Sequence, residues 1–415
     1  MSDIEVYLDW QGECRPVGLL RRQPGRGREV VSFQYDDQWI NAHDGFSIDA
    51  SLKVGRGTYV PGPNQEMFGT LGDSAPDQWG RRLMRRAERR RADREGRSVR
   101  TLFEADYLLG VVDETRLGAL RFKFAGEDQF QAPTSTGVPS VIDLGKLLGI
   151  TERVLRDEET DEDLLMIFAP GSSLGGARPK ASIIDQHNKL AIAKFPKETD
   201  EYSIEIWEEV ALRLAKLAGI NTATHSLVKV AGKSVLLSQR FDRNEQVRIP
   251  FMSAMSMTGS IDGEGGSYLD IVDALSEFGA QARVDRIELF RRMVFNVLIS
   301  NVDDHLRNHG FLMLGSNGWT LSPAYDLNPT PQDLKPRILT TNIDFDEGTC
   351  SIELVREVAS FFGLNKVSAD QIISEVAKAT NCWRDVATSV GAKPSEIRRM
   401  ESAFYHEDLE VALSL

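Results

Sequence analysis

The stretch Asn301-Val302-Asp303-Asp304-His305-Leu306-Arg307-Asn308 places two carboxylates, a histidine and two amides close together. It follows segment 284–301, where apolar residues recur at three- and four-residue spacings and predict a helix with one buried stripe. A polar cluster has no packing reason to follow so apolar a helix, so the pattern predicts a functional site. The stripe consists of Ile287, Phe290, Val294, Val297 and Leu298.

The order of polar residues in and after this stretch fits phosphoryl transfer. A kinase needs a carboxylate that accepts the proton of the substrate hydroxyl, and an amide oxygen and a second carboxylate that hold Mg²⁺. Asp303, Asn308 and Asp326 occur in that order, and the Asp-x-x-x-x-Asn spacing agrees with the catalytic loop of protein kinases. An alternative stays open, because His305 and His309 are four residues apart and could bind a transition metal together with Asp303 or Asp304.

Two features upstream point the same way. The segment Gly171-Ser-Ser-Leu-Gly-Gly-Ala-Arg-Pro-Lys180 has small residues that let backbone N–H groups approach a phosphate, although the segment taken alone favours a plain glycine-rich loop over a nucleotide clamp. Lys194 follows Ala191-Ile192-Ala193, so it either meets an anion or reaches solvent. In kinases such a strand lysine pairs with the phosphates and with a glutamate of the next helix. The helix expected over 203–217 offers Glu205, Glu208 and Glu209.

The whole chain is compatible with a two- or three-domain globular protein. It has 415 residues and a net charge of −13, which opposes non-specific adhesion to nucleic acid or anionic lipid. Its three cysteines lie far apart and predict neither a disulfide framework nor a zinc ribbon. No apolar run is long enough to span a bilayer, and the N-terminus is acidic, so we expect a cytoplasmic protein without membrane contact. Alternating stretches within 4–60 predict β-hairpins, and 131–140 predicts a linker.

Taken together, these blocks resemble the HipA family of bacterial serine/threonine kinase toxins. The resemblance implies an α+β fold: a two-lobed, protein-kinase-like unit with an extra N-terminal β-containing subdomain and a mostly helical C-terminal lobe. It divides the chain into 1–130, 131–242 and 243–415. The matching blocks are Phe68–Gly80, Gly118–Phe122, Ser173–Lys180, Leu237–Arg243, Asn301–Asn308 and Leu321–Asp326.

The resemblance also implies ATP and Mg²⁺ as cofactors and assigns roles to individual residues. Asp303 would be the catalytic base, and Asn308 and Asp326 would hold the metal. Segment 239–241 would form the hinge beside adenine. The implied nucleotide site comprises Gly175, Gly176, Ala177, Arg178, Pro179, Lys180, Lys194, Gln239, Arg240, Phe241, His305, Leu306, Arg307, Asn308, Tyr325 and Asp326.

Regulation and partners follow from the same resemblance. Ser173 falls where family members autophosphorylate, with Ser172 as the neighbouring alternative, and about two added negative charges beside a phosphate-binding loop would oppose ATP binding. The expected partners are a HipB-like helix-turn-helix antitoxin and a protein substrate, which in some relatives is an aminoacyl-tRNA synthetase. A rival hypothesis is a kinase-shaped corepressor that holds the antitoxin on DNA and whose catalysis is dispensable.

An arginine-rich helix is expected between Asp77 and Arg100. Residues 81–100 contain ten arginines and three acids, a local charge of +7, so the rest of the chain carries −13 − 7 = −20. One interpretation is a contact between Arg81–Arg100 and DNA phosphates or an acidic partner. The interpretation we favour is a solvated helix whose Leu83, Met84 and Ala87 face the core.

Overall fold

The computed structural model describes residues 3–25, 27–132, 137–168, 176–245, 247–315 and 317–415. The chain forms two compact units. The first unit comprises Met1–Glu198, Val230–Lys233 and Leu237–Met252; the second comprises Thr199–Lys229, Ser234–Leu236 and Ser253–Leu415. Among the described residues, no helix combines the length and the apolar character that crossing a membrane requires.

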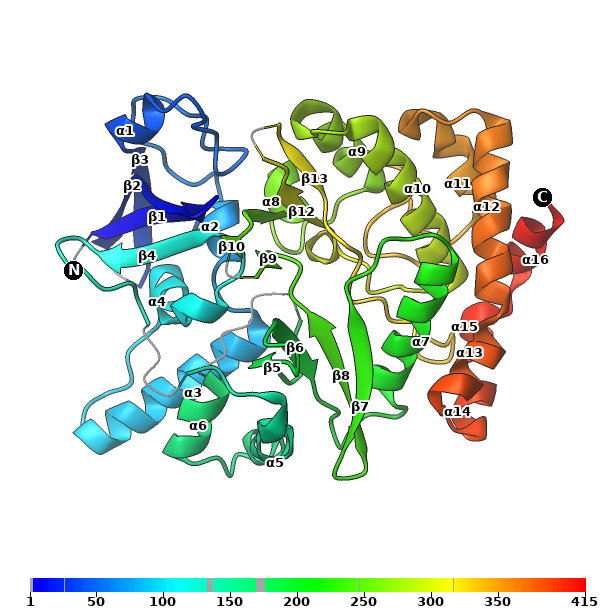
Figure 1. The fold of residues 1–415 in the computed structure, drawn as a ribbon, viewed down its shortest axis with the longest axis horizontal. Coiled ribbons are helices and arrows are strands. Elements are labelled where there is room, and N and C mark those ends of the chain that lie inside the picture. Colours follow the sequence, from blue (N-terminus) through cyan, green and yellow to red (C-terminus); the bar gives the residue numbers. More distant parts are fainter. Residues whose placement is uncertain (1–2, 26, 133–136, 169–175, 246, 316) are drawn as a thin grey trace. The chain divides into compact units, whose positions relative to one another are not determined.

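The first unit begins with an antiparallel sheet in the strand order β3-β2-β1-β4 (Figure 1). Its alternating sequence buries one face, as β1 shows by burying every second residue from Ile4 to Trp10. The predicted hairpins are therefore confirmed. The strands are β1 (Ile4–Trp10), β2 (Glu13–Pro24), β3 (Glu29–Tyr35) and β4 (Leu120–Phe124), and the short helices around them are α1 (Asp37–Ile40), α2 (Gly69–Asp73), α4 (Glu104–Gly110) and η1 (Asp113–Thr115).

The arginine-rich segment forms α3 (Gln78–Glu95). Asp77 caps its first turn by accepting a hydrogen bond from the backbone N–H of Gly80, and Gly96, at φ 62°, ends the helix in the left-handed conformation. The predicted helix is confirmed, although it stops before Arg100. Three further elements accompany it in this unit: η2 (Val141–Asp143), α5 (Leu144–Leu155) and α6 (Asp161–Phe168).

A hairpin of β5 (Lys180–Ile184) and β6 (Leu190–Lys194) follows. Its antiparallel register places Lys180 directly opposite Lys194. Asp185 stabilises the expected turn, because its carboxylate accepts hydrogen bonds from the backbone of His187 and Lys189. The sheet has the order β5-β6-β8-β7, with β7 (His225–Val230) and β8 (Lys233–Gln239); β9 (Arg243–Asn244) and β10 (Val247–Arg248) form a separate short pair.

The second unit is mainly helical and contains a short antiparallel hairpin of β12 (Gly310–Met313) and β13 (Trp319–Leu321). These strands and β11 (Phe251–Ser253), where the chain enters this unit, were not predicted, because each is very short. The helices are α7 (Ile204–Leu217), α8 (Ala254–Thr258), α9 (Tyr268–Phe278), α10 (Ala282–Leu298), η3 (Leu306–Asn308), α11 (Ile352–Val358), η4 (Ala359–Phe362), α12 (Lys366–Asn381), α13 (Trp383–Val390), α14 (Pro394–Arg399), α15 (Glu401–Phe404) and α16 (Glu407–Ser414).

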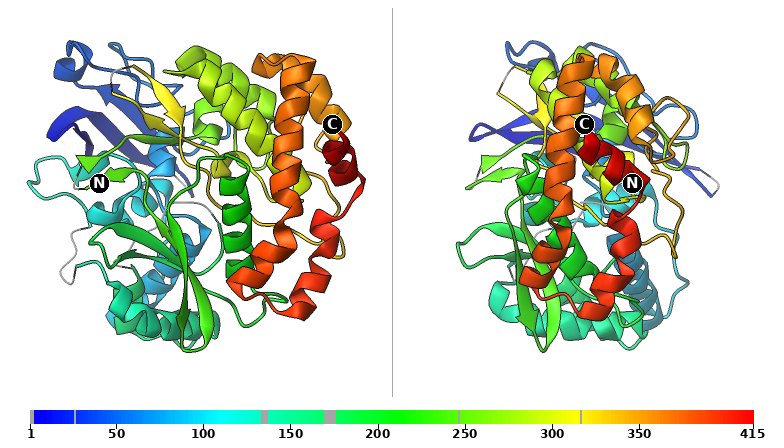
Figure 2. Two further views of the ribbon diagram at one scale, coloured as in Figure 1. Left: turned by 45° about the vertical axis from the view of Figure 1, so that its right-hand side comes forward. Right: turned by 90° about the vertical axis from the view of Figure 1, so that its right-hand side faces the viewer.

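Helix α10 is the central element of the second unit. Phe290, Val294, Val297 and Leu298 are fully buried, so the predicted apolar stripe is core, with Ile287 only half-buried. Helix α12 lies alongside α10 and α7 (Figure 2). Helix α10 ends earlier than predicted, at Leu298. The chain then turns through Ser300, which adopts the left-handed conformation at φ 53°, into the polar stretch.

Candidate active site

The stretch that follows α10, residues 301–308, is called here the catalytic segment. The side chain of Asp303 is 66% exposed, and its Oδ1 lies 3.6 Å from Nζ of Lys335, which is also exposed. The carboxylate of Asp303 is thus accessible to solvent. Nothing in the sequence pattern indicated Lys335, because the pair depends on the tertiary fold.

Asn308 is the buried end of the catalytic segment. Its Nδ2 donates a hydrogen bond to the backbone carbonyl of Asp303, 3.2 Å away, and so ties the two predicted functional residues together. Its Oδ1 is buried and accepts no hydrogen bond from any described residue. A buried amide oxygen without a donor is costly unless a cation or water satisfies it, so this atom fits a metal ligand.

The segment around Asp326 lies beside the catalytic segment. Tyr325 donates its hydroxyl hydrogen to the backbone carbonyl of Arg307, 2.7 Å away. Asp326 itself adopts φ 57°, an unusual conformation for a residue with a side chain, and its Oδ1 accepts a hydrogen bond from Nδ2 of Asn328 at 3.1 Å. Asn308 and Asp326 carry the kinds of oxygen atom that Mg²⁺ prefers, and their role as metal ligands stays a prediction.

A buried polar network supports the catalytic segment from α9 and α10. Asp304 is buried, and its carboxylate accepts a hydrogen bond from the hydroxyl of Tyr268 at 2.5 Å, while its Oδ1 lies 3.1 Å from Nε2 of His309. Asn296 donates to the same hydroxyl at 2.9 Å and accepts from Nδ2 of Asn301. Burial, and then the charge of Asp304, raise the pKa of Tyr268 well above its usual value. The sequence analysis missed Tyr268 and Asn296.

The same network bears on the alternative in which His305 and His309 bind a transition metal. The ring of His309 is buried against Asp304 and edge-on to Tyr268, which makes it part of the packing. Within the part of the chain that the structure describes, no group of three or more histidine, cysteine or acidic side chains could hold a metal ion. The interpretation of His305 and His309 as a metallohydrolase pair is therefore wrong.

The predicted phosphate-binding residues belong to the first unit. Lys194 is the last residue of β6, and Gly176, at φ 101°, precedes β5. Nζ of Lys180 lies 2.8 Å from Oδ2 of Asp77, and both side chains are almost completely buried. Gly175, Ser172 and Ser173 lie outside the described residues.

The predicted hinge residues have structural partners. Gln239 donates to Asp185 at 2.7 Å, and Arg240 forms an ion pair with Asp242 in which both side chains are fully buried. The Arg240 guanidinium also donates to the backbone carbonyls of Thr115 and Arg116. Burial opposes the charge of Asp242, but its arginine neighbours outweigh burial and lower its pKa to about 2. The Arg240 side chain thus stabilises the predicted hinge segment, 239–241, through buried contacts.

Glu209 on α7 has two close polar partners within the second unit. The Glu209 carboxylate accepts from Arg213 at 2.7 Å and lies 2.7 Å from Nδ1 of His225. Burial would raise its pKa, but these two partners lower it. Glu205 and Glu208 are buried on the same helix. A pairing of Lys194 with either of them stays a prediction.

The charge of the arginine-rich segment is largely compensated within the first unit. Leu83 is buried in an apolar cluster against which Ala87 packs, as predicted. Arg85 donates to the hydroxyl of Tyr107, and among the described residues Arg82, Arg89 and Arg91 form no ion pair. The ion pairs join Arg81 to Glu104, Arg86 to Asp157 and Glu159, Arg90 to Glu159 and Asp161, Arg94 to Asp161, Arg97 to Glu88 and Glu95, and Arg100 to Glu88 and Asp106.

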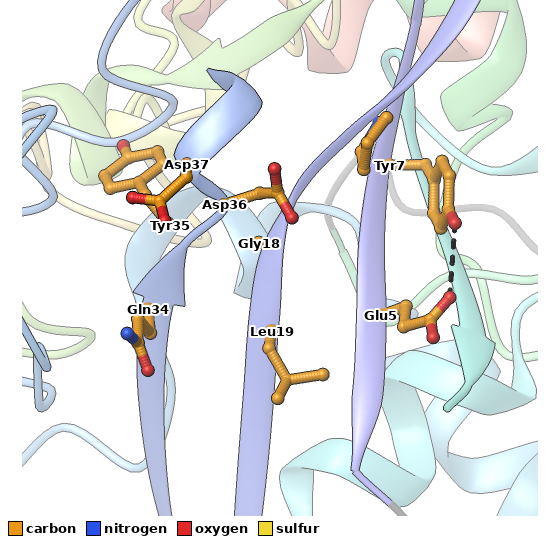
Figure 3. A pocket seen from close by; sticks show the side chains of 9 residues that line it. Glu5, Tyr7, Gly18, Leu19, Gln34, Tyr35, Asp36 and Asp37 are labelled. Atoms are coloured by element: carbon orange, nitrogen blue, oxygen red, sulfur yellow. Dashed lines mark hydrogen bonds between the residues drawn. The ribbon is translucent and has the colours of Figure 1, made fainter. Parts of the chain in front are cut away.

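A pocket of about 520 Å³ lies on the N-terminal sheet (Figure 3). Its lining includes Glu5, Tyr7, Gln34 and Asp36, and Tyr7 donates a hydrogen bond to Glu5 at 3.2 Å. None of the predicted site residues lines this pocket, so it is separate from the candidate active site.

Comparisons with known proteins agree with this picture. The family model for the HipA-like C-terminal domain matches residues 172–383, and the model for the HipA N-terminal domain matches residues 6–105. A chain of the solved complex of HipA, HipB and operator DNA from Shewanella oneidensis MR-1 has a TM-score of 0.68 and 17% identity, with 99% of each chain covered. This structural match confirms the predicted kinase-like α+β fold.

Curated relatives match shorter stretches of the chain at a higher identity than this solved structure. The chain is 26% identical over 195 residues to a putative kinase of Haemophilus influenzae, covering 41% of this chain and 57% of that protein. It is 27% identical over 187 residues to the serine/threonine-protein kinase toxin HipA of Shewanella oneidensis, covering 38% of this chain and 43% of that protein. The chain thus spans about half the length of the curated relatives it matches.

Proposed function

The chain belongs to the HipA family, and we propose that it is an ATP- and Mg²⁺-dependent serine/threonine protein kinase. The observation that carries the proposal is the pairing of an exposed carboxylate with a buried, available amide oxygen. Asp303 is open to solvent, whereas Oδ1 of Asn308, held to Asp303 through its own Nδ2, accepts no hydrogen bond among the described residues. Phosphoryl transfer needs both groups side by side.

In this proposal each residue has a distinct task. Asp303 orients the substrate hydroxyl and accepts its proton as the oxygen attacks the transferring phosphoryl group. Mg²⁺, held by Asn308 and Asp326, supplies charge neutralisation on the phosphates when bound. Lys194 binds the phosphates, and the hinge 239–241 contacts adenine. Phosphoryl transfer is mainly positioning and electrostatics, which matches the carboxylates and amide that the second unit offers and the lysine that the first unit offers.

We further propose that the protein is the toxin of a toxin–antitoxin pair and binds a HipB-like, DNA-binding antitoxin. The support is family membership and the solved Shewanella oneidensis complex, which contains HipA, HipB and operator DNA. Autophosphorylation at Ser173, or at Ser172, would switch the kinase off, because a phosphate beside the glycine-rich segment repels the phosphates of ATP. The protein substrate, with an aminoacyl-tRNA synthetase as one candidate, belongs to the same proposal.

A growth assay tests the toxin proposal against the rival corepressor. Expression of the wild-type protein without antitoxin should arrest growth, and Asp326→Ala should abolish the arrest because the metal ligand is lost. Asp273→Ala, which removes an exposed acid of α9 outside the site, is the matched control and should arrest growth like the wild type. Arrest by Asp326→Ala at equal protein levels would favour the corepressor.

A further inference from the structure

The buried ion pair between Asp77 and Lys180 joins the two regions that the family models match separately. Asp77 lies in the N-terminal match and Lys180 in the C-terminal one, and both belong to the first compact unit. Nζ of Lys180 lies 2.8 Å from Oδ2 of Asp77, and each side chain is only 3% exposed. Oδ1 of Asp77 accepts the backbone N–H of Gly80 at the start of α3. One carboxylate therefore both caps α3 and holds Lys180.

Trp79 holds the backbone of the same lysine. Its indole Nε1 donates a hydrogen bond to the carbonyl oxygen of Lys180 at 3.1 Å, across 101 residues of sequence. The indole is itself fixed, because Trp79 is buried in the apolar cluster with Leu83 and Ile150. Two residues at the start of α3 thus contact both the side-chain ammonium and the backbone carbonyl of Lys180.

Lys180 also lies next to residues of the proposed nucleotide site. It is the first residue of β5 and lies directly opposite Lys194 in the antiparallel register. Gly176 approaches it so closely that a Cβ there would stand 3.2 Å from Nζ of Lys180. The backbone carbonyl of Pro179 accepts the N–H of Phe195, which ties the residues before β5 to the end of β6.

We propose that Lys180 is a positioning residue, held by Asp77 and Trp79, which fixes residues 176–179 and Lys194 for nucleotide binding. This inference rests on the proposed kinase function. It replaces the direct phosphate contact that the family resemblance implies for Lys180 with an indirect role. It also means that the N-terminal domain influences the kinase reaction, because the first turn of α3 affects the affinity for ATP.

The sign of one substitution separates the two roles of Lys180. If Lys180 bound phosphate directly, Asp77→Asn would release its ammonium and strengthen ATP binding. If Lys180 is a positioning residue, Asp77→Asn weakens ATP binding, by about tenfold, because a small displacement of a binding group is enough for such a loss. Trp79→Phe keeps the ring and removes only the indole N–H, so we expect a loss of about threefold.

The experiment is calorimetric titration of the full-length protein with ATP in the presence of Mg²⁺, together with rates of ATP hydrolysis at saturating ATP, a reaction that does not use Ser172 or Ser173 as the acceptor. Both variants should raise the dissociation constant and leave the saturated rate within about twofold of the wild type, since catalytic groups are untouched. Glu29→Gln is the matched control, because Glu29 forms an equally buried ion pair with Arg22 in the N-terminal sheet, and it should bind ATP like the wild type. Wild-type or tighter ATP binding by folded Asp77→Asn and Trp79→Phe would overturn the inference.

Hydrogen exchange keeps the inference separate from the proposed function. If the wild-type protein binds no ATP, the proposed function fails, yet the positioning role is still tested by amide exchange in β5 and β6. Both variants should exchange faster there than the wild type and Glu29→Gln. Unchanged exchange would overturn the positioning role, and if Asp77→Asn does not fold, Trp79→Phe decides both measurements.

Discussion

Tyr268 donates its hydroxyl hydrogen to the buried carboxylate of Asp304, 2.5 Å away. Asp304 directly follows Asp303, the proposed catalytic base, in the sequence. The hydroxyl also accepts from Asn296 of α10. The exposed Asp303 is therefore followed directly by a buried residue, Asp304. Tyr268 of α9 holds Asp304 in place, and Asn296 of α10 holds Tyr268. This arrangement leads to the first prediction.

Tyr268→Phe should destabilise the second unit by about 1–3 kcal/mol, because it removes a donor from a buried carboxylate. We also expect a lower rate of phosphate transfer, since the backbone that carries Asp303 loses a support. Denaturant unfolding and initial rates measure the two effects. Tyr405→Phe, at a half-exposed tyrosine, is the control and should change neither; a Tyr268→Phe protein with wild-type stability and rate would contradict the supporting role.

Asn308→Ala should raise the Mg²⁺ concentration needed for half-maximal ATP binding by about tenfold or more, as expected when a metal ligand is removed. The physical reason is the loss of the buried Oδ1 that accepts no hydrogen bond among the described residues. Titration of Mg²⁺ at fixed ATP measures this shift. Asn381→Ala removes an exposed asparagine at the end of α12 and should leave the titration unchanged. An unshifted midpoint for Asn308→Ala would show that Asn308 is no ligand.

His406 should make the second unit sensitive to acid. Burial, and then the positive charge of Arg337, lower its pKa from 6.5 to about 4, although Asp408 opposes this shift. Its Nε2 donates to the carbonyl of Leu298, and its Nδ1 accepts the N–H of Leu409 as the N-cap of α16. Protonation of Nδ1 would break this cap.

The direction of the pH effect follows from the lowered pKa. Below pH 6.5 His406 takes up a proton in the unfolded chain but stays neutral in the folded protein. The free energy of unfolding therefore falls as the pH drops to about 4, by up to about 3 kcal/mol at ~1.4 kcal/mol per pH unit. His406→Asn keeps a capping side chain and should lose this part of the pH dependence, as denaturant midpoints between pH 7 and 4 would show. His187→Asn, on an exposed turn, should follow the wild type. Equal slopes for all three proteins would refute the assignment.

Arg86 and Arg89 should differ although both lie on α3. The Arg86 guanidinium lies 2.7 Å from the buried carboxylate of Glu159, whereas Arg89 is exposed and forms no ion pair among the described residues. Arg86→Ala should cost about 1–3 kcal/mol of stability, because it weakens the pairing of a buried charge. Arg89→Ala should stay within about 0.5 kcal/mol. Equal effects of the two substitutions would mean that the ion pairs of α3 contribute nothing.

Local patterns in the sequence were sufficient for the elements that carry the site. The apolar period of α10 predicted that helix, and Gly219, which follows α7 at φ 77°, indicated where α7 ends, because periodicity and helix termination depend on neighbours in the chain. The spacing of Asp303 and Asn308 likewise lies within one segment. In the structure Nδ2 of Asn308 donates to the backbone carbonyl of Asp303, while the catalytic roles of both residues stay a prediction.

Contacts between distant segments could not be predicted. Tyr268 and Asp304 are 36 residues apart, and Trp79 and Lys180 are 101 apart, so no window of sequence contains both partners. The arginines of α3 show the same limit for charge. A count over 81–100 gives +7, yet most of their acidic partners, among them Glu104, Glu159 and Asp161, lie outside that window.

Transfer of labelled phosphate from ATP tests the central claim most directly. The purified wild-type protein, with ATP and Mg²⁺, should become labelled, and Asp303→Asn should bind ATP like the wild type but remain unlabelled, because it lacks the carboxylate that accepts the hydroxyl proton. Asp333→Asn, at another exposed aspartate of the same unit, should be labelled like the wild type. Equal labelling of wild type and Asp303→Asn, or no labelling of the wild type, would contradict the account.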